Sequence, residues 1–410
     1  MNKLKLREFL DTHETPLYIF DMDALEQRIK YLREQFPPQT SLCYAIKANP
    51  FLSKELAGLV DRLELCSSGE VEICRSLGIS PKHYVISGLY KEPQLVRDLI
   101  VKDLPVCRYT VESIRQLAML RSVARCAGRR IPLLLRLTGG NQFGLTQNQL
   151  EELVSQYARD SWVDICGIQY FSGTQKTSVK RMKRELDMLD SVLKRLSQIP
   201  GSKIRELEFG PGLPVNYFEN DFIDEEGITA ALSEALGAME FGGRITLELG
   251  RSIAAYCGHY FTRVVDLKRM DGQNFAIVDG GMHQLVYYGQ SMAMKRPRIS
   301  LPFVSGAVSG AETWNICGSL CTANDILAKQ LHLPGLSLGD ILQFDNAGAY
   351  CMTEGLSLFL SRELPEIVLH RAGKFITVRK RTQTSALNAP DYDSNLRCQI
   401  WKDLLKYSKT

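Results

Sequence analysis

The chain has 410 residues, of which 45% are hydrophobic and 23% charged, so we expect two domains with large cores rather than intrinsic disorder. The net charge is only +4 and no basic tract is interleaved with aromatic residues, which argues against a nucleic-acid-binding protein. The 11 cysteines form no CxxC pair, so we expect no metal site. The first 15 residues contain no apolar signal core, and no run is apolar enough to span a bilayer. We therefore expect a cytoplasmic protein with reduced thiols.

Between about residue 40 and residue 250, short apolar runs alternate with amphipathic helical stretches. The predicted helices are the one that opens at a capping-box pattern from Ser67 to Glu70 and runs through Leu77, then Val111–Ala127, Thr146–Tyr157 and Val179–Leu196. The predicted strands are Leu42–Ala45, Arg62–Leu65, His83–Ile86, Val106–Arg108, Ile131–Leu137, Val163–Tyr170, Glu206–Phe209 and Ile245–Leu249. Eight strands alternating with helices predict a parallel (β/α)8 TIM barrel, and a doubly wound open sheet is the competing interpretation.

After residue 255 the pattern becomes rich in strands, which predicts a second domain of β-barrel or sandwich type. Its expected strands are Tyr260–Leu267, Asn274–Val278, Trp314–Cys317, Asp340–Phe344, Glu366–His370 and Lys374–Val378. The strand Leu17–Phe20 precedes the barrel and is able to join it, but we assign residues 1–24 with 256–385 to the β-rich domain and 25–255 to the barrel. Residues 386–410 form a polar tail with a helix-like segment near Ile400–Leu405, to which we assign no function.

Residues suited to chemistry follow the predicted barrel strands, and active sites of such barrels lie at the carboxyl ends of the strands. Gly210 and Gly212 allow a backbone to approach a phosphate, although an ordinary glycine turn explains them equally well. Arg251 offers a fixed positive charge for that phosphate, or else a surface ion pair. Glu248 ends an apolar strand and either keeps a ring nitrogen protonated or pairs with Arg136.

Several motifs give the chain a specific resemblance. They occur in family order between about residues 16 and 370: Tyr44–Asn49, Glu64–Glu70, Gly173–Gln175, Gly210–Gly212, Glu248–Arg251, Asp279–His283, Gly318–Asp325, Gly339-Asp340 and Gly348–Tyr350. In these motifs the chain resembles the fold-type III pyridoxal-phosphate decarboxylases, the group of diaminopimelate, ornithine and arginine decarboxylases. The resemblance implies an α/β fold with an alanine racemase-like barrel, and pyridoxal 5'-phosphate as the cofactor.

The resemblance also implies roles for single residues. Lys47 is the implied Schiff-base lysine, Glu248 the partner of the pyridine nitrogen, and Cys321 a proton donor that a neighbouring subunit supplies. Tyr350 matches a tyrosine expected to approach the phosphate from that same neighbouring subunit, so a homodimer with shared sites is implied. The other implied cofactor-binding residues are Glu64, Arg136, Phe171, Thr174, Gly210, Pro211, Gly212, Gly250 and Arg251.

Three positions depart from the family pattern. Phe171 stands where the family has a histidine stacked on the cofactor, and Pro211 replaces a glycine of the phosphate turn and removes one backbone donor. Thr322 replaces the acid that follows the interface cysteine and meets the distal ammonium of a diamino acid. Because an unpaired buried ammonium is costly, this argues against lysine, ornithine or diaminopimelate as substrate, unless an acid such as Asp325 compensates.

The stretches Gly173–Gln175, Val278–His283 and Leu320–Thr322 resemble a branch of antibiotic and siderophore pathways, some of whose members act on aminoacyl groups tethered to carrier proteins. We therefore expect α-decarboxylation of an amino acid, either tethered to an acyl or peptidyl carrier protein or as a free diamino acid. An amino-acid racemase of related fold and a non-catalytic cofactor-binding barrel are the remaining alternatives.

Overall fold

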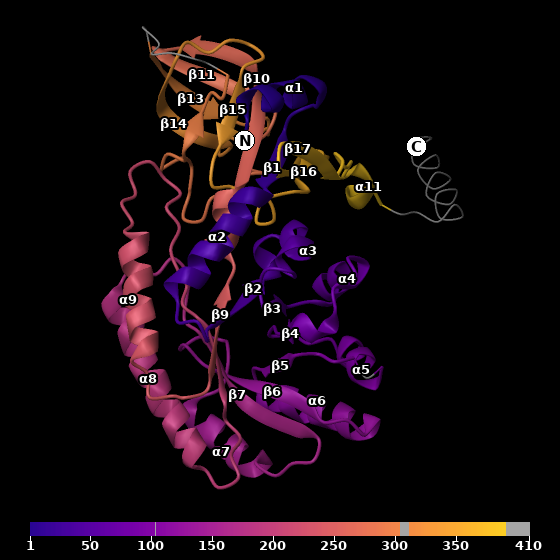
Figure 1. Cartoon of the computed structure of the whole chain (residues 1–410). Coiled ribbons are helices and arrows are strands. Elements are labelled where there is room, and N and C mark those ends of the chain that lie inside the picture. Colours follow the sequence, from indigo (N-terminus) through magenta and orange to yellow (C-terminus); the bar gives the residue numbers. More distant parts are fainter. Residues whose placement is uncertain (103, 304–310, 391–410) are drawn as a thin grey trace, which may run out of the picture.

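The structure is a computed structural model that describes residues 1–102, 104–303 and 311–390, so the predicted segment near Ile400–Leu405 lies outside the described residues. Its larger part is a closed barrel of eight parallel strands (Figure 1). The strands are β2 (Ser41–Ala45), β3 (Arg62–Leu65), β4 (Tyr84–Ile86), β5 (Arg108–Val111), β6 (Ile131–Leu137), β7 (Val163–Phe171), β8 (Glu206–Gly210) and β9 (Arg244–Leu249). Because β9 pairs in parallel with β2, the sheet has no free edge, and the open doubly wound alternative is wrong.

Helices cover the outside of the barrel, and Figure 1 shows α7, α8 and α9 along one side of it. Helix α8 turns seven buried residues toward the barrel, as its amphipathic sequence predicts. The helices of this part are α2 (Met22–Gln35), α3 (Ser53–Leu56), α4 (Ser68–Ser76), α5 (Pro93–Val101), α6 (Ile114–Ala127), α7 (Gln147–Tyr157), α8 (Val179–Gln198), α9 (Glu225–Gly237) and α10 (Arg251–Ala254), with short 3-10 turns η1 (Ile46–Ala48), η2 (Pro50–Leu52), η3 (Pro81–His83) and η4 (Ala255–Cys257).

The largest boundary error of the sequence prediction lies around β5. The strand was expected at Val106–Arg108 but begins at Arg108, and it continues through Val111, which was expected to open the next helix. Val111 is fully buried and pairs with Leu135 of β6, whereas Ser113 caps α6 by accepting a hydrogen bond from the N–H of Gln116 at 3.1 Å. The serine cap, not the apolar run, fixes where α6 starts.

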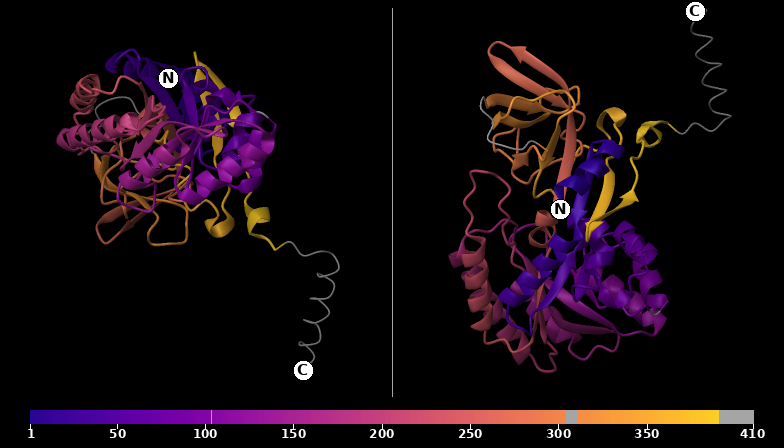
Figure 2. Two further views of the ribbon diagram at one scale, coloured as in Figure 1. Left: turned by 90° about the horizontal axis from the view of Figure 1, so that it is seen from below. Right: turned by 45° about the horizontal axis from the view of Figure 1, so that its top comes forward.

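The second part is a mixed nine-stranded sheet that stands above the barrel in Figure 2 (right). Its strands are β1 (Leu17–Asp21), β10 (Gly258–Met270), β11 (Gln273–Val278), β12 (Ile299–Ser300), β13 (Glu312–Cys317), β14 (Ile326–Leu333), β15 (Ile341–Phe344), β16 (Glu366–Arg371) and β17 (Lys374–Arg379), with α1 (Lys3–Thr12), η5 (Phe359–Ser361) and α11 (Ser385–Asn388) at its margins. Strand β1 pairs with β10 and β16, so it lies in this sheet and does not join the barrel.

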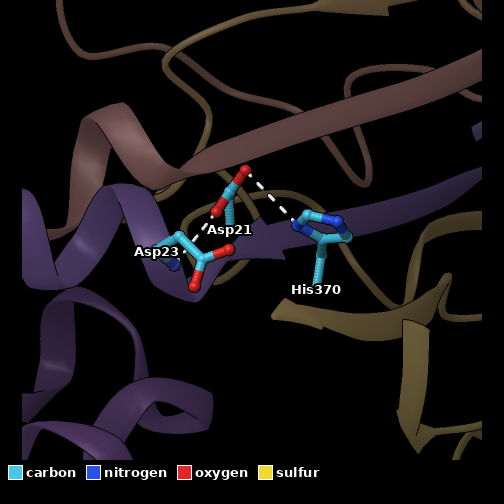
Figure 3. A group of neighbouring side chains, drawn as sticks. All are labelled: Asp21, Asp23 and His370. Carbon is cyan, nitrogen blue, oxygen red and sulfur yellow. Dashed lines mark hydrogen bonds and ion pairs between the residues drawn. The ribbon is translucent and has the colours of Figure 1, made fainter. Parts of the chain in front are cut away.

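The two parts meet where β1 continues into α2. Asp21 caps α2 by accepting hydrogen bonds from the N–H groups of Asp23 and Ala24, and its other oxygen lies 3.4 Å from Nδ1 of His370 on β16 (Figure 3). Asp23 accepts a hydrogen bond from the N–H of Ala372 at 2.9 Å. These contacts tie the first barrel helix to the second sheet. Within the described part of the chain, the structure contains no helix that is long and apolar enough to cross a membrane.

Candidate active site

A cavity of about 570 Å³ opens at the carboxyl ends of the barrel strands. Ten of the residues predicted for a site line it: Lys47, Glu64, Arg136, Phe171, Thr174, Gly212, Glu248, Gly250, Arg251 and Tyr350. Nine of them lie at or just after the ends of barrel strands, which closure of the barrel brings into one ring, whereas Tyr350 comes from the segment that follows β15 of the second sheet.

Lys47 stands on the 3-10 turn η1 that ends β2, and its side chain is 41% exposed into the cavity. Its Nζ forms an ion pair with Glu64 of β3 and lies 3.8 Å from Oε1 of Glu248 on β9. Burial opposes the charged amine, but the carboxylates of Glu64 and Glu248 prevail and raise the pKa of Lys47 well above its ordinary value. Without a reaction partner the amine is therefore a protonated cation between two acids.

The two carboxyl groups differ in their surroundings. Burial works against ionisation of Glu64, but the adjacent Lys47 lowers the pKa of that carboxyl below its ordinary value. Burial, together with the charge of Glu64, raises the pKa of Glu248 to about 7. Oε2 of Glu248 accepts a hydrogen bond of 2.6 Å from Nε2 of Gln169, a residue of β7 that the sequence analysis did not single out. Glu248 is thus poised between its two protonation states near neutral pH.

One of the two sequence interpretations paired Glu248 with Arg136, and the structure shows that this pairing is wrong. Nη1 of Arg136 donates a hydrogen bond to Oε1 of Glu112 at 3.1 Å, and the Arg136 guanidinium lies 4.5 Å from the centre of the Phe143 ring. Both of these partners were missed, since neither belongs to a motif. The Nε of Arg136 is buried without a hydrogen-bond partner among the described residues, which leaves one donor at the cavity wall.

Arg251 opens the short helix α10, directly after Gly250, and is held by several side chains. Its Nε lies 3.3 Å from the hydroxyl of Thr174, and its Nη1 donates a 2.9 Å hydrogen bond to the hydroxyl of Tyr217. The guanidinium also lies 4.6 Å from the ring centre of Tyr350 and 4.7 Å from that of Tyr288. The sequence had suggested a surface ion pair as the alternative for Arg251, but the side chain is buried and points into the cavity wall.

The glycines near Arg251 are closely surrounded: Gly212 has no room for a side chain, and Gly250 has only a tight space for one. A Cβ at Gly212, where φ is +66°, would lie 2.1 Å from the carbonyl oxygen of Gly173, and one at Gly250 would lie 3.1 Å from the Tyr350 hydroxyl. Gly210 and Pro211 are described by the structure but do not line the cavity. A Cβ at Gly210 would lie 2.7 Å from the ring of Phe171, so this glycine makes room for the aromatic side chain.

The structure corrects the expectation that Tyr350 approaches the cavity from a neighbouring subunit. Tyr350 lines the cavity of its own chain. Its N–H donates a 2.7 Å hydrogen bond to the carbonyl of Ala48, and Nδ2 of Asn49 donates one of 2.9 Å to the carbonyl of Gly348. The segment Gly348–Tyr350 is therefore fastened to the turn that carries Lys47.

Cys321, Thr322 and Asp325 do not line this cavity within the single chain that the structure describes. Cys321 is exposed, and its expected contribution to the cavity of a neighbouring subunit stays a prediction. Asp325 is buried and accepts hydrogen bonds from the N–H groups of Met282 at 2.7 Å and Leu320 at 2.8 Å. Both oxygens of Asp325 are thus occupied in holding the loop together.

Comparison with known proteins gives consistent matches. Residues 17–348 match the family model described as "Pyridoxal-dependent decarboxylase, C-terminal sheet domain". The chain is 26% identical over 392 residues to diaminopimelate decarboxylase of Helicobacter pylori, covering 91% of this chain and 95% of the relative. It is 27% identical over 399 residues to a decarboxylase of L-glutamyl-BtrI acyl-carrier protein from Niallia circulans, covering 90% and 91%. A structure of H. pylori diaminopimelate decarboxylase with L-lysine superposes with a TM-score of 0.82 at 24% identity, covering 93% and 98%.

Proposed function

This chain belongs to the pyridoxal-dependent decarboxylases, enzymes that act on amino acids with pyridoxal phosphate as cofactor, and we propose that it decarboxylates an aminoacyl group tethered to a carrier protein. The observation that carries the proposal is the lack of a free charge after Cys321: Thr322 is neutral, and Asp325 is buried with each oxygen accepting a backbone hydrogen bond, which argues against a distal ammonium there. The similarity to a relative that acts on a glutamyl carrier protein supports the same conclusion. The family match also favours decarboxylation over the racemase alternative.

The residues around the cavity fit pyridoxal phosphate. Lys47 would hold its aldehyde carbon, and Arg251 with Thr174 and the backbone at Gly212 would hold the phosphate. Two observations support this fit: Gly212 leaves no room for a Cβ, so its backbone is open to a ligand, and the guanidinium of Arg251 is already held by the hydroxyl of Tyr217. Glu248 would face the ring nitrogen, and Phe171 would lie against the ring. When bound, the cofactor supplies a sink for the electron pair that remains on the α-carbon when carbon dioxide leaves.

The residues of the chain then have separate tasks. Lys47 would hold the cofactor until the amine of the substrate is bound in the cavity. Glu248, ionised, would stabilise a proton on the ring nitrogen, because the attraction between a carboxylate and a cationic N–H is stronger where the carboxylate is buried. Cys321 of a second copy of the chain delivers a proton to the α-carbon. We assign these tasks as part of the proposal.

The substrate is tested by measuring carbon dioxide release from a panel at equal concentrations. L-Glutamyl thioester on an acyl carrier protein is compared with free glutamate, arginine, lysine, ornithine and diaminopimelate. We expect release from the thioester and only background release from the free amino acids, because the tether supplies binding energy that a free amino acid lacks. Equal or faster release from a free diamino acid would refute the tethered substrate and leave the decarboxylase activity standing.

One observation favours a second candidate, the decarboxylation of a free diamino acid. The side chain of Glu354 lines the cavity, is exposed, and makes no ion pair or hydrogen bond within the described ranges of the chain. A carboxylate in this place is able to meet a distal ammonium in the role that Thr322 no longer fills.

If a free diamino acid is the substrate, Glu354→Gln is expected to raise its KM about tenfold with little change in kcat, because only a distal ion pair is lost. Steady-state kinetics with lysine and ornithine measure this. Glu240→Gln serves as the control, since Glu240 is 74% exposed and pairs with Lys194 away from the cavity. An unchanged KM in Glu354→Gln would remove this residue from substrate recognition.

We also propose that the active enzyme is a cytoplasmic homodimer with shared sites. Cys321 is exposed and lies outside the cavity of its own chain, so it reaches reacting atoms only in another copy. Co-expression of Lys47→Ala and Cys321→Ala chains is therefore expected to restore roughly a quarter of the wild-type activity, since half of the dimers then contain one intact site.

The control for this mixing experiment pairs Lys47→Ala with Glu248→Gln. Both residues belong to the cavity of one chain, so every site in the mixed dimer stays damaged and no activity returns. Failure of the Lys47→Ala and Cys321→Ala pair to complement, with dimers confirmed by two affinity tags, would show that Cys321 is not shared between chains.

A further inference from the structure

Below the floor of the cavity, the barrel interior contains a polar layer that the proposed chemistry does not yet use. Gln169 of β7 is fully buried and does not line the cavity. Its Nε2 donates the 2.6 Å hydrogen bond to Glu248, whereas its Oε1 is buried without a hydrogen-bond partner among the described residues. The amide therefore uses its donor end and leaves its acceptor end unsatisfied, which is costly in a buried position.

Glu208 is the neighbour of Gln169 on the adjacent strand. The two residues are register partners of β7 and β8, and both are fully buried. Oε2 of Glu208 lies 3.3 Å from Nη1 of Arg62, across the barrel interior, but Oε1 has no hydrogen-bond partner in the described part of the chain. Since register partners on parallel strands project side by side, the two unsatisfied oxygens belong to neighbouring side chains.

Two acceptor oxygens satisfy each other only if one of them carries a proton. Burial, reinforced by the charges of Glu248, Glu206 and Glu64, raises the pKa of Glu208 to about 8 even though Arg62 opposes the shift. Glu208 is thus mostly a neutral carboxylic acid at pH 7, able to donate one hydrogen bond.

We propose that the Glu208 carboxylic acid donates a hydrogen bond to Oε1 of Gln169 and so fixes the orientation in which Gln169 presents its N–H to Glu248. Gln169 and Glu208 then act as positioning residues that keep Glu248 ionised and aimed at the ring nitrogen. The chain of hydrogen bonds from Glu208 through Gln169 to Glu248, the relay, involves the protein alone, whereas the orientation of Glu248 toward the ring nitrogen rests on the proposed function.

The relay favours the ionised form of Glu248 over its neutral form. The groups facing Glu248 are Cys43 on β2, Lys47 from the turn after β2, Glu64 on β3, Arg136 on β6, Gln169 on β7, Glu208 on β8 and Tyr350 from the second part of the chain. Burial and the charge of Glu64 favour the neutral form of Glu248, and the hydrogen bond from Gln169 is one of the contributions that favour the carboxylate. If the amide turned over, its oxygen would face Glu248 and the contribution would change sign.

The test measures the titration of Glu248 in the cofactor-free full-length chain by NMR of glutamate labelled with 13C at the side-chain carboxyl, with the signal assigned through Glu248→Gln. We expect Gln169→Leu to raise the titration midpoint of Glu248 by about one to two pH units. Glu208→Leu is expected to raise it in the same direction. Glu208→Gln, whose amide still donates to Gln169, is expected to stay within a few tenths of a unit of the wild type.

Thr246→Val is the matched control. Thr246 is the register partner of Glu208 on β9, is fully buried, and has an unsatisfied hydroxyl, so it is the alternative acceptor that the relay leaves unused. We expect no change in the Glu248 midpoint when this hydroxyl is removed. A midpoint that moves in Thr246→Val but not in Glu208→Leu, or an ionised Glu208 at pH 7, would overturn the relay.

The relay and the proposed function fail in different ways. An unchanged Glu248 midpoint in Gln169→Leu overturns the relay whatever the enzyme does. If the midpoint rises as expected while the pH profile of decarboxylation stays unchanged, the relay stands and the role of Glu248 at the ring nitrogen is lost. If Gln169→Leu does not fold, the difference between Glu208→Leu and Glu208→Gln decides the question.

Discussion

Lys47→Ala is expected to abolish the absorbance of protein-linked pyridoxal phosphate and to lower kcat on the order of 10³-fold or more. Lys47 is the lysine whose amine enters the cavity on the turn after β2, where it meets both Glu64 and Glu248. Removing the amine removes the attachment of the cofactor and the base that frees the product. The measurements are the absorbance spectrum after addition of cofactor and the rate of carbon dioxide release.

A small primary amine added to Lys47→Ala should recover part of the lost rate, because it takes the place of the missing side-chain amine. Lys54→Ala is the control, since Lys54 is exposed and donates only to the carbonyl of Leu77. Full turnover by Lys47→Ala without added amine would end the proposal that this lysine carries the cofactor.

Glu248→Gln is expected to keep the cofactor bound through Lys47 but to lower kcat by roughly 10²–10³-fold, the usual cost of removing one preorganised electrostatic partner. The side chain keeps its size and loses the charge that we propose for stabilising the protonated ring nitrogen. The retained absorbance of bound cofactor separates this result from that of Lys47→Ala, where the absorbance disappears.

The pH dependence gives the second part of the same prediction. In the cofactor-free chain the pKa of Glu248 is raised to about 7, so ionisation of this buried carboxyl works against folding. Its contribution to stability is fully present below the unfolded pKa and is lost as the pH rises through the folded pKa near 7. The free energy of unfolding, from urea titrations of the cofactor-free chain, should therefore fall less between pH 5 and pH 8 in Glu248→Gln than in the wild type. An identical slope in both proteins would contradict the raised pKa.

The sequence anticipated the barrel and most of the cavity wall for a definite reason. Apolar runs alternating with amphipathic helices permit few other folds, and residues that follow the strands of a closed parallel barrel meet at one end. Lys47, Glu64, Glu248 and Arg251 all follow or end such runs, so their position along the chain was enough to bring them together.

Boundaries and partners were less predictable. The sequence predicted Val111 in a helix, yet it belongs to β5, because its burial against β6 outweighs the helical pattern of the residues that follow it. Asp325 lies four residues after Cys321 in the sequence and was expected to be available to a substrate, but its carboxylate is buried and accepts hydrogen bonds from backbone N–H groups of Met282 and Leu320. No local pattern distinguishes an acid that caps backbone N–H groups from one that faces a ligand.

The sequence by itself determined the order of the elements and the residue types around the cavity, since periodicity and strand ends are local properties of the chain, whereas closure of the barrel became certain only from the pairing of β9 with β2. Only the tertiary structure decided that Arg136 pairs with Glu112, that Tyr350 serves its own chain, and that Gln169 and Glu208 lie side by side beneath Glu248. These are contacts between residues far apart in sequence, and their geometry depends on strand register and on which oxygen or nitrogen each buried side chain turns to its neighbour.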